Sequence, residues 1–107
     1  MAERRGGLRV PVQMWVEEQG PKGTYFQRSA NLSEGGIFLE RTIPHPIGTQ
    51  VTLKLQLPDG GEPVEVRAEI VNAAAGEGEL GMGMRFLDLD DAAQRRVRRL
   101  VEKKQTK

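Results

Sequence analysis

The fold is decided by residues 51–70, which read VTLKLQLPDGGEPVEVRAEI. Apolar and polar side chains alternate on both sides of the PDGG tetrapeptide at 58–61. Period-two alternation predicts a strand with one buried face, and Pro, Asp and Gly in this order favour a tight turn. The stretch therefore predicts a β-hairpin whose two strands, 51–57 and 64–70, each contribute an apolar face to one core.

The same alternation recurs on either side of this hairpin. It predicts four further short strands, at 10–17, 24–30, 37–40 and 82–86. Pro11 favours a strand start or an edge position, because proline cannot donate a hydrogen bond to a neighbouring strand. Six short antiparallel strands between residues 10 and 87 predict a small barrel or a sandwich.

After Phe86 the apolar period changes to that of a helix. Ala93, Val97, Leu100 and Val101 recur at helical spacing, and Asp90 is suited to cap the helix. We predict a C-terminal α-helix over 88–104. The acidic residues at its start, Asp88, Asp90 and Asp91, are explained by capping and by the helix dipole. Its basic residues, Arg95, Arg96, Arg98 and Arg99, are interpreted as a solvated face.

Length and composition predict one ordinary globular domain. The chain has 107 residues, of which 37% are hydrophobic and 29% charged. We divide it into an arginine-rich arm (1–9), a barrel (10–87) and the helix (88–104). It has no cysteine, which excludes disulfides and thiolate metal sites. No apolar run approaches the ~20 residues of a membrane span and no signal peptide is visible, so we expect a cytoplasmic location.

The net charge of +1 hides an uneven distribution. Residues 1–9 hold three Arg and one Glu (+2), residues 10–91 hold six basic and thirteen acidic residues (−7), and residues 92–107 hold seven basic residues and one acidic residue (+6). A protein that binds nucleic acid along its surface carries basic charge over a broad face. The acidic barrel therefore argues against nucleic-acid binding, although the basic segment 92–107 keeps it as an alternative.

The sequence offers no constellation for catalysis. The single histidine, His45, lies between two prolines, and no cysteine accompanies it. This argues against a metal site and against histidine-based nucleophilic catalysis. We therefore expect no enzymatic activity and no metal. Trp15, on the polar side of the first strand, is interpreted as covering one edge of the barrel, with a partner contact as the alternative.

Two polar stretches predict a binding site. The first, Arg4-Arg5-Gly6-Gly7-Leu8-Arg9, carries guanidinium groups that can form paired hydrogen bonds with phosphate oxygens or with the O6/N7 edge of guanine. The second, Asn31-Leu32-Ser33-Glu34-Gly35-Gly36, combines short polar side chains with glycines that permit close approach to the backbone. Together they predict a pocket for a phosphorylated, purine-containing anion.

The order and spacing of these stretches resemble the bipartite signature of PilZ domains, which are bacterial receptors for cyclic di-GMP. Arg5-x-x-x-Arg9 precedes the first hairpin, and Asn31-x-Ser33-x-x-Gly36 follows it. Residues 31–40 and 83–88 are also similar to typical strands of the family. The resemblance covers nearly the whole chain. It implies a mainly β fold, a six-stranded antiparallel PilZ-like barrel with one C-terminal α-helix, preceded by the arginine arm.

The resemblance also implies a ligand and its contacts. The arginines would bind the phosphates or guanines of cyclic di-GMP, Asn31 and Ser33 would bond guanine, and the glycine pair would allow close approach. Arg4 could reach a second ligand molecule, because the family binds the nucleotide as a monomer or an intercalated dimer. The ligand-binding residues are therefore predicted to be Arg4, Arg5, Arg9, Asn31, Ser33, Gly35 and Gly36.

The resulting hypothesis is a cyclic di-GMP sensor that has no cofactor of its own. Binding would order residues 3–10 against the barrel. The signal would pass to an unidentified downstream protein or through a homodimer, in bacterial motility, surface attachment or matrix production. The main alternative is a PilZ-like adaptor that works through protein contacts without binding the nucleotide.

Overall fold

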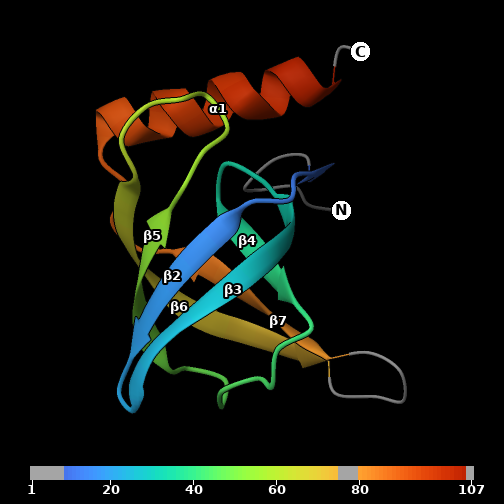
Figure 1. The fold of residues 1–107 in the computed structure, drawn as a ribbon, viewed down its shortest axis with the longest axis vertical. Coiled ribbons are helices and arrows are strands. Elements are labelled where there is room, and N and C mark those ends of the chain that lie inside the picture. Colours follow the sequence, from blue (N-terminus) through green and yellow to red (C-terminus); the bar gives the residue numbers. More distant parts are fainter. Residues whose placement is uncertain (1–8, 75–79, 106–107) are drawn as a thin grey trace.

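The computed structural model describes residues 9–74 and 80–105, which form a small β-barrel with one helix across its end (Figure 1). The elements are β1 (Val10–Pro11), β2 (Trp15–Gly20), β3 (Gly23–Leu32), β4 (Gly36–Glu40), β5 (Gln50–Leu55), β6 (Val64–Ala74), β7 (Gly81–Phe86) and α1 (Asp91–Gln105). No helix in the described part of the chain is long and apolar enough to cross a membrane.

Six antiparallel strands close the barrel. Their hydrogen-bonded order is β3-β2-β5-β6-β7-β4, and the pairing of β4 with β3 completes the ring. The strands of the opening hairpin, β5 and β6, pair from Gln50 opposite Glu69 to Leu55 opposite Val64. This confirms the predicted six-stranded antiparallel barrel with one C-terminal helix, and closure selects the barrel over the sandwich.

The first predicted strand differs from the expectation, because it is interrupted. β1 and β2 both pair with β3, but the register shifts by one residue between them: Pro11 lies opposite Asn31, and Trp15 lies opposite Arg28. The buried Ser29 hydroxyl bridges the gap by donating to the Val12 carbonyl (2.6 Å) and accepting from the Met14 amide (3.1 Å). The alternation of buried side chains continues across this break, at Val10, Val12, Met14 and Val16.

The barrel interior is filled by the apolar side chains that the period-two pattern selects. Val16, Leu32, Ile37, Leu39, Leu53, Leu55, Ile70 and Met82 are fully buried. Burying one such side chain stabilises the fold by about 1.5–3 kcal/mol. The core is therefore the main source of stability.

The helix closes one end of this core. It packs beside β1 and buries Val97, Leu100 and Val101. It begins at Asp91 rather than at residue 88 as predicted, because Asp88 bonds to Arg67 and Asp90 is the cap. The Asp90 carboxylate accepts from the Ala93 amide at 2.8 Å, which confirms its predicted capping role.

Candidate functional site

The second polar stretch forms the turn between β3 and β4. The Ser33 amide donates to the Gly36 carbonyl (2.9 Å), and the Ser33 hydroxyl accepts from the amides of Gly35 (3.3 Å) and Gly36 (3.1 Å). The Ser33 side chain is buried. Ser33 therefore stabilises the turn through side-chain-to-backbone bonds, and its predicted contact with guanine stays a prediction.

The glycine pair fixes this turn to the neighbouring strand. The Gly35 carbonyl accepts from the Phe86 amide at 2.9 Å. A Cβ atom at Gly36 would lie 2.2 Å from the Met84 carbonyl oxygen, so β4 and β7 could not pair as closely with any other residue. Glycine is thus required at position 36 by backbone packing, where the sequence suggested close approach of a ligand.

The structure brings the two polar stretches together. The Arg9 guanidinium, just before β1, donates to the Asn31 side-chain oxygen in β3 at 2.8 Å. The contact is possible because β1 pairs with the end of β3, where Pro11 lies opposite Asn31. Five of the predicted ligand-binding residues therefore lie at one part of the barrel rim, formed by the start of β1 and by the β3–β4 turn; we call this part the arginine edge. The other two, Arg4 and Arg5, lie outside the described residues.

The helix also reaches this turn. Arg98 of α1 donates from Nε to the Glu34 carboxylate at 3.2 Å, in the middle of the predicted motif. Sequence reasoning missed this contact, because the two residues are 64 positions apart and no local pattern pairs them. It links the candidate ligand site to the C-terminal element.

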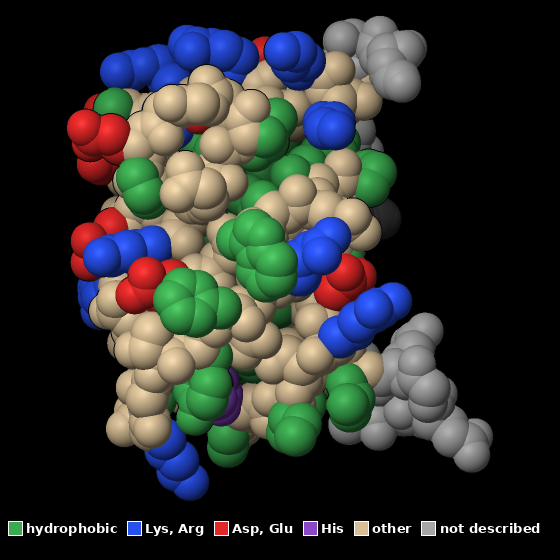
Figure 2. Space-filling view, in the orientation of Figure 1, with side chains coloured by type: hydrophobic (Ala, Val, Ile, Leu, Met, Phe, Trp, Pro, Cys, Tyr) green, Lys and Arg blue, Asp and Glu red, His purple; other side chains and the backbone are tan. Residues whose placement is uncertain are grey.

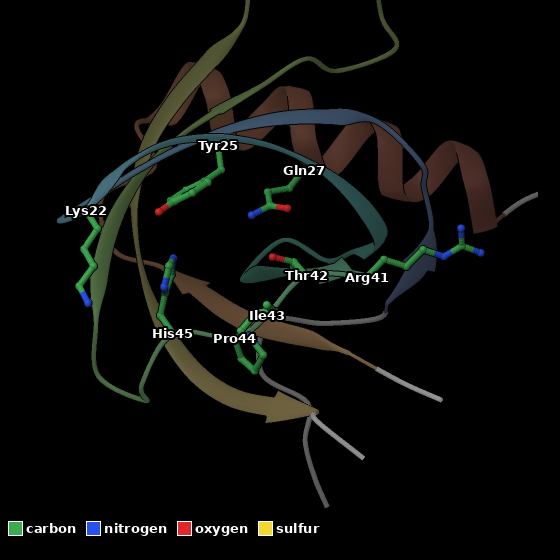
Figure 3. A pocket seen from close by; sticks show the side chains of 8 residues that line it. All are labelled: Lys22, Tyr25, Gln27, Arg41, Thr42, Ile43, Pro44 and His45. Carbon is green, nitrogen blue, oxygen red and sulfur yellow. The ribbon is translucent and has the colours of Figure 1, made fainter. Parts of the chain in front are cut away.

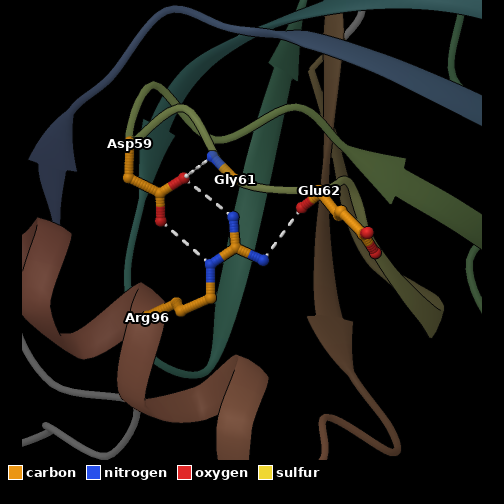
Figure 4. A network of polar contacts seen from close by, with 4 residues as sticks. All are labelled: Asp59, Gly61, Glu62 and Arg96. Carbon is orange, nitrogen blue, oxygen red and sulfur yellow. Dashed lines mark hydrogen bonds and ion pairs between the residues drawn. The ribbon is translucent and has the colours of Figure 1, made fainter.

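A second contact ties the helix to the β5–β6 loop (Figure 4). Arg96 donates to both Asp59 oxygens, at 2.9 Å and 2.7 Å, and to the Glu62 carbonyl at 2.8 Å. The Arg96 side chain and then the Gly61 amide lower the pKa of Asp59 from 3.8 to about 2. Arg95, Arg98 and Arg99 are exposed, as predicted for a solvated face. Arg96 departs from this prediction, because it is half-buried and paired with Asp59.

The β2–β3 turn lies at the end of the barrel away from the helix (Figure 1). A hollow beside this turn is lined by residues of β3 and of the β4–β5 connection (Figure 3). Its volume is about 480 Å³. Tyr25, Gln27, Thr42 and His45 point into it, while Arg41 extends away (Figure 3). The His45 ring tilts against the Tyr25 ring, with 6.1 Å between centroids.

A buried carboxylate lies behind this hollow. Glu18 of β2 is fully buried, accepts a hydrogen bond from the Gln27 side-chain Nε2 at 2.9 Å and contacts His45 Nε2. The sequence contained a signal for it, because the alternation of the first strand continues inward from Val16 to Glu18. In the described residues no group of three or more His, Cys, Asp or Glu side chains could hold a metal ion.

The family model and the similar solved structures point to the same family. The family model of the PilZ domain matches residues 3–103. No curated protein sequence matches the chain. Among solved structures, the Bacillus subtilis inhibitor of motility MotI/DgrA is similar, with a TM-score of 0.84 and 18% identity, covering 97% of this chain and 52% of that one. This chain thus spans about half the length of that protein.

Two solved PilZ domains match over nearly their full length. The PilZ domain of YcgR from Escherichia coli, solved with c-di-GMP, has a TM-score of 0.76 and 15% identity, covering 96% of this chain and 92% of that one. The PilZ domain of CeSA from a cellulose-synthesizing bacterium has a TM-score of 0.66 and 24% identity, covering 91% and 97%. These likenesses show a shared fold, and the family match decides the assignment: the chain belongs to the PilZ domain family.

Proposed function

We propose that this protein is a receptor for cyclic di-GMP that binds the nucleotide where Arg9 meets Asn31. The observation that carries the proposal is the contact between these two side chains, which unites the two halves of the motif at one edge of the barrel. Membership of the PilZ family supports it, as do related folds solved with c-di-GMP in YcgR and in Klebsiella pneumoniae MrkH.

The chemistry of the edge suits such a ligand. Arg9 donates to a neutral amide oxygen, which leaves its positive charge uncompensated by that contact. A nucleotide phosphate accepts from a guanidinium more strongly than an amide does, because both partners are charged. The Asn31 side chain, released from Arg9, could then bond the polar edge of guanine. Arg4 and Arg5 would add contacts from the arm.

Thermal unfolding with and without nucleotide tests this function. A ligand that binds only the folded chain, present at about 100 times its dissociation constant, raises the free energy of unfolding by ~2.7 kcal/mol. We expect cyclic di-GMP to raise the midpoint and GMP at the same concentration to leave it nearly unchanged. An unchanged midpoint at millimolar cyclic di-GMP would contradict the receptor function and favour an adaptor that works without the nucleotide.

We also propose that the bound state is transmitted through a protein contact. Exposed apolar side chains in the β4–β5 connection, Ile43 (77% exposed) and Ile47 (67%), support an interaction surface there. Sedimentation velocity with and without cyclic di-GMP separates two routes. A dimer that forms only with ligand would assign the output to self-association, and a monomer in both states would assign it to a downstream protein.

A further inference from the structure

Arg28 lies on the same outer face of the barrel as the Arg9–Asn31 contact. Three residues apart on a regular strand, Arg28 and Asn31 would point to opposite faces. The register of β3 against β4 shifts between Ser29 and Asn31, however, so that Arg28 lies opposite Glu40 and Asn31 opposite Phe38. Ser29 and Leu32 point into the core, which leaves Arg28 and Asn31 together on the outside, about 10 Å apart along the strand.

Arg28 is bonded to a neutral side chain, whereas most of the other paired arginines bond to carboxylates. Among the described residues, four arginines form ion pairs with carboxylates, namely Arg67, Arg85, Arg96 and Arg98. Arg28 instead donates to the Gln13 side-chain oxygen at 3.1 Å, just as Arg9 donates to Asn31. No ion pair within the described ranges 9–74 and 80–105 neutralises either side chain. Two guanidinium groups that form no ion pair with any described residue therefore lie in a row on one face.

An aromatic ring supports the second guanidinium. The Arg28 Cζ atom lies 5.3 Å from the centre of the Trp15 ring, and the two residues are cross-strand partners. Trp15 is 58% exposed and Phe26, two positions before Arg28, is 71% exposed. Figure 2 shows one face of the barrel, with hydrophobic side chains in its middle and both basic and acidic side chains beside them. A guanidinium held over an indole keeps its other planar face available for a purine base.

We infer that Arg28, supported by Trp15, is a second nucleotide-contacting position, which stacks on the guanine farther from Asn31. This inference rests on the proposed function. The Arg9–Asn31 edge would hold one end of cyclic di-GMP, and the Arg28–Trp15 pair would hold the base at the other. In this inference Trp15 contributes to binding by positioning Arg28, in addition to covering part of the barrel surface.

The single tryptophan of the chain gives a direct measurement, because its emission reports on the environment of Arg28. Titration of the full chain with cyclic di-GMP is expected to change Trp15 fluorescence saturably. Arg28→Ala is expected to weaken binding about tenfold, the usual effect of losing one stacked or bidentate arginine contact. Arg28→Lys keeps the charge but loses the planar group, so we expect most of this loss to remain. Arg95→Ala, which removes an exposed charge from α1, is the matched control and should bind like the wild type.

The possible results are distinguishable. If calorimetry shows that the wild type, Arg28→Ala and Arg28→Lys all bind equally tightly, the inference about Arg28 is wrong. The proposed receptor function is then still supported. Absence of binding by the wild type would overturn both. Thermal unfolding of each variant without ligand checks the fold, and Trp15→Phe provides a conservative second variant, expected to weaken binding less than Arg28→Ala does.

Discussion

At the scale of single residues, Gly36 shows how a motif position can serve packing. Any side chain there meets the Met84 carbonyl oxygen, which belongs to the backbone of a paired strand and cannot rotate away. The residue is therefore required by the barrel whether or not a ligand is present.

Gly36→Ala is expected to lower the free energy of unfolding by about 2 kcal/mol, because the β4–β7 pairing must shift to admit the Cβ atom. Urea unfolding measures this difference. Gly20→Ala is the control, since a Cβ there would lie at an ordinary distance of 3.5 Å from Val51 Cγ1. A Gly36→Ala variant as stable as Gly20→Ala would refute the packing explanation.

His45 is the second residue whose role the structure defines. Its ring contacts the fully buried Glu18 side chain, and among the described residues Gln27 is the other hydrogen-bond partner of that side chain. His45→Ala is expected to lower the free energy of unfolding by about 3 kcal/mol, because it leaves a buried carboxyl group without one of its hydrogen-bond partners. Glu18→Gln in the same background should recover part of that loss. Stabilities of the four proteins, measured in urea, complete the cycle, and strictly additive losses would show that the two residues do not interact.

At the scale of elements, the helix is held to the barrel by polar contacts as well as by its apolar face. Arg96 forms an ion pair with the β5–β6 loop, and Arg98 forms one with the β3–β4 turn. The first of these contacts has a defined pH dependence, because the pKa of Asp59 is lowered to about 2.

A carboxylate whose pKa is lower in the folded state stabilises the fold above its unfolded pKa, and this stabilisation is lost as the pH falls. The stability difference between the wild type and Asp59→Asn should therefore be constant above about pH 5 and shrink between about pH 4 and pH 2. Because the pair is partly exposed, we expect a difference of about 1 kcal/mol or less. Urea unfolding at several pH values measures it, with Arg96→Met as a matched variant. A difference that stays constant down to pH 2 would argue against this contact.

The elements also show where sequence reasoning succeeds and where it stops. Strands such as β5 and β6 can be predicted from the local sequence, because side chains two positions apart in a strand point to the same face and therefore share one polarity. The break between β1 and β2 does not, since it depends on the Ser29 hydroxyl reaching Val12 and Met14 from another strand. The late start of α1 likewise depends on Arg67, which bonds Asp88 from β6.

At the scale of the whole molecule, the candidate site is assembled by the pairing of β1 with the end of β3. The motif predicted that Arg9 and Asn31 belong together, and the pairing of β1 with β3 brings them into contact. A turn held by side-chain-to-backbone bonds at Ser33 is one interpretation of the motif, and the structure has these bonds. The approach of Arg98 to Glu34 could not be predicted, because it requires the three-dimensional arrangement of the turn and the helix. The ligand-binding role of these residues remains a prediction.

The most direct test of the account is a calorimetric titration of the full chain with cyclic di-GMP, resolved for molar ratio. We predict saturable binding by the wild type and by Arg95→Ala. Binding should weaken at least about 100-fold in the double variant Arg5→Ala/Arg9→Ala, because two charge-assisted contacts are lost. Absence of heat with the wild type, or undiminished binding by the double variant, would contradict the claim that this PilZ domain binds the nucleotide at the arginine edge of its barrel.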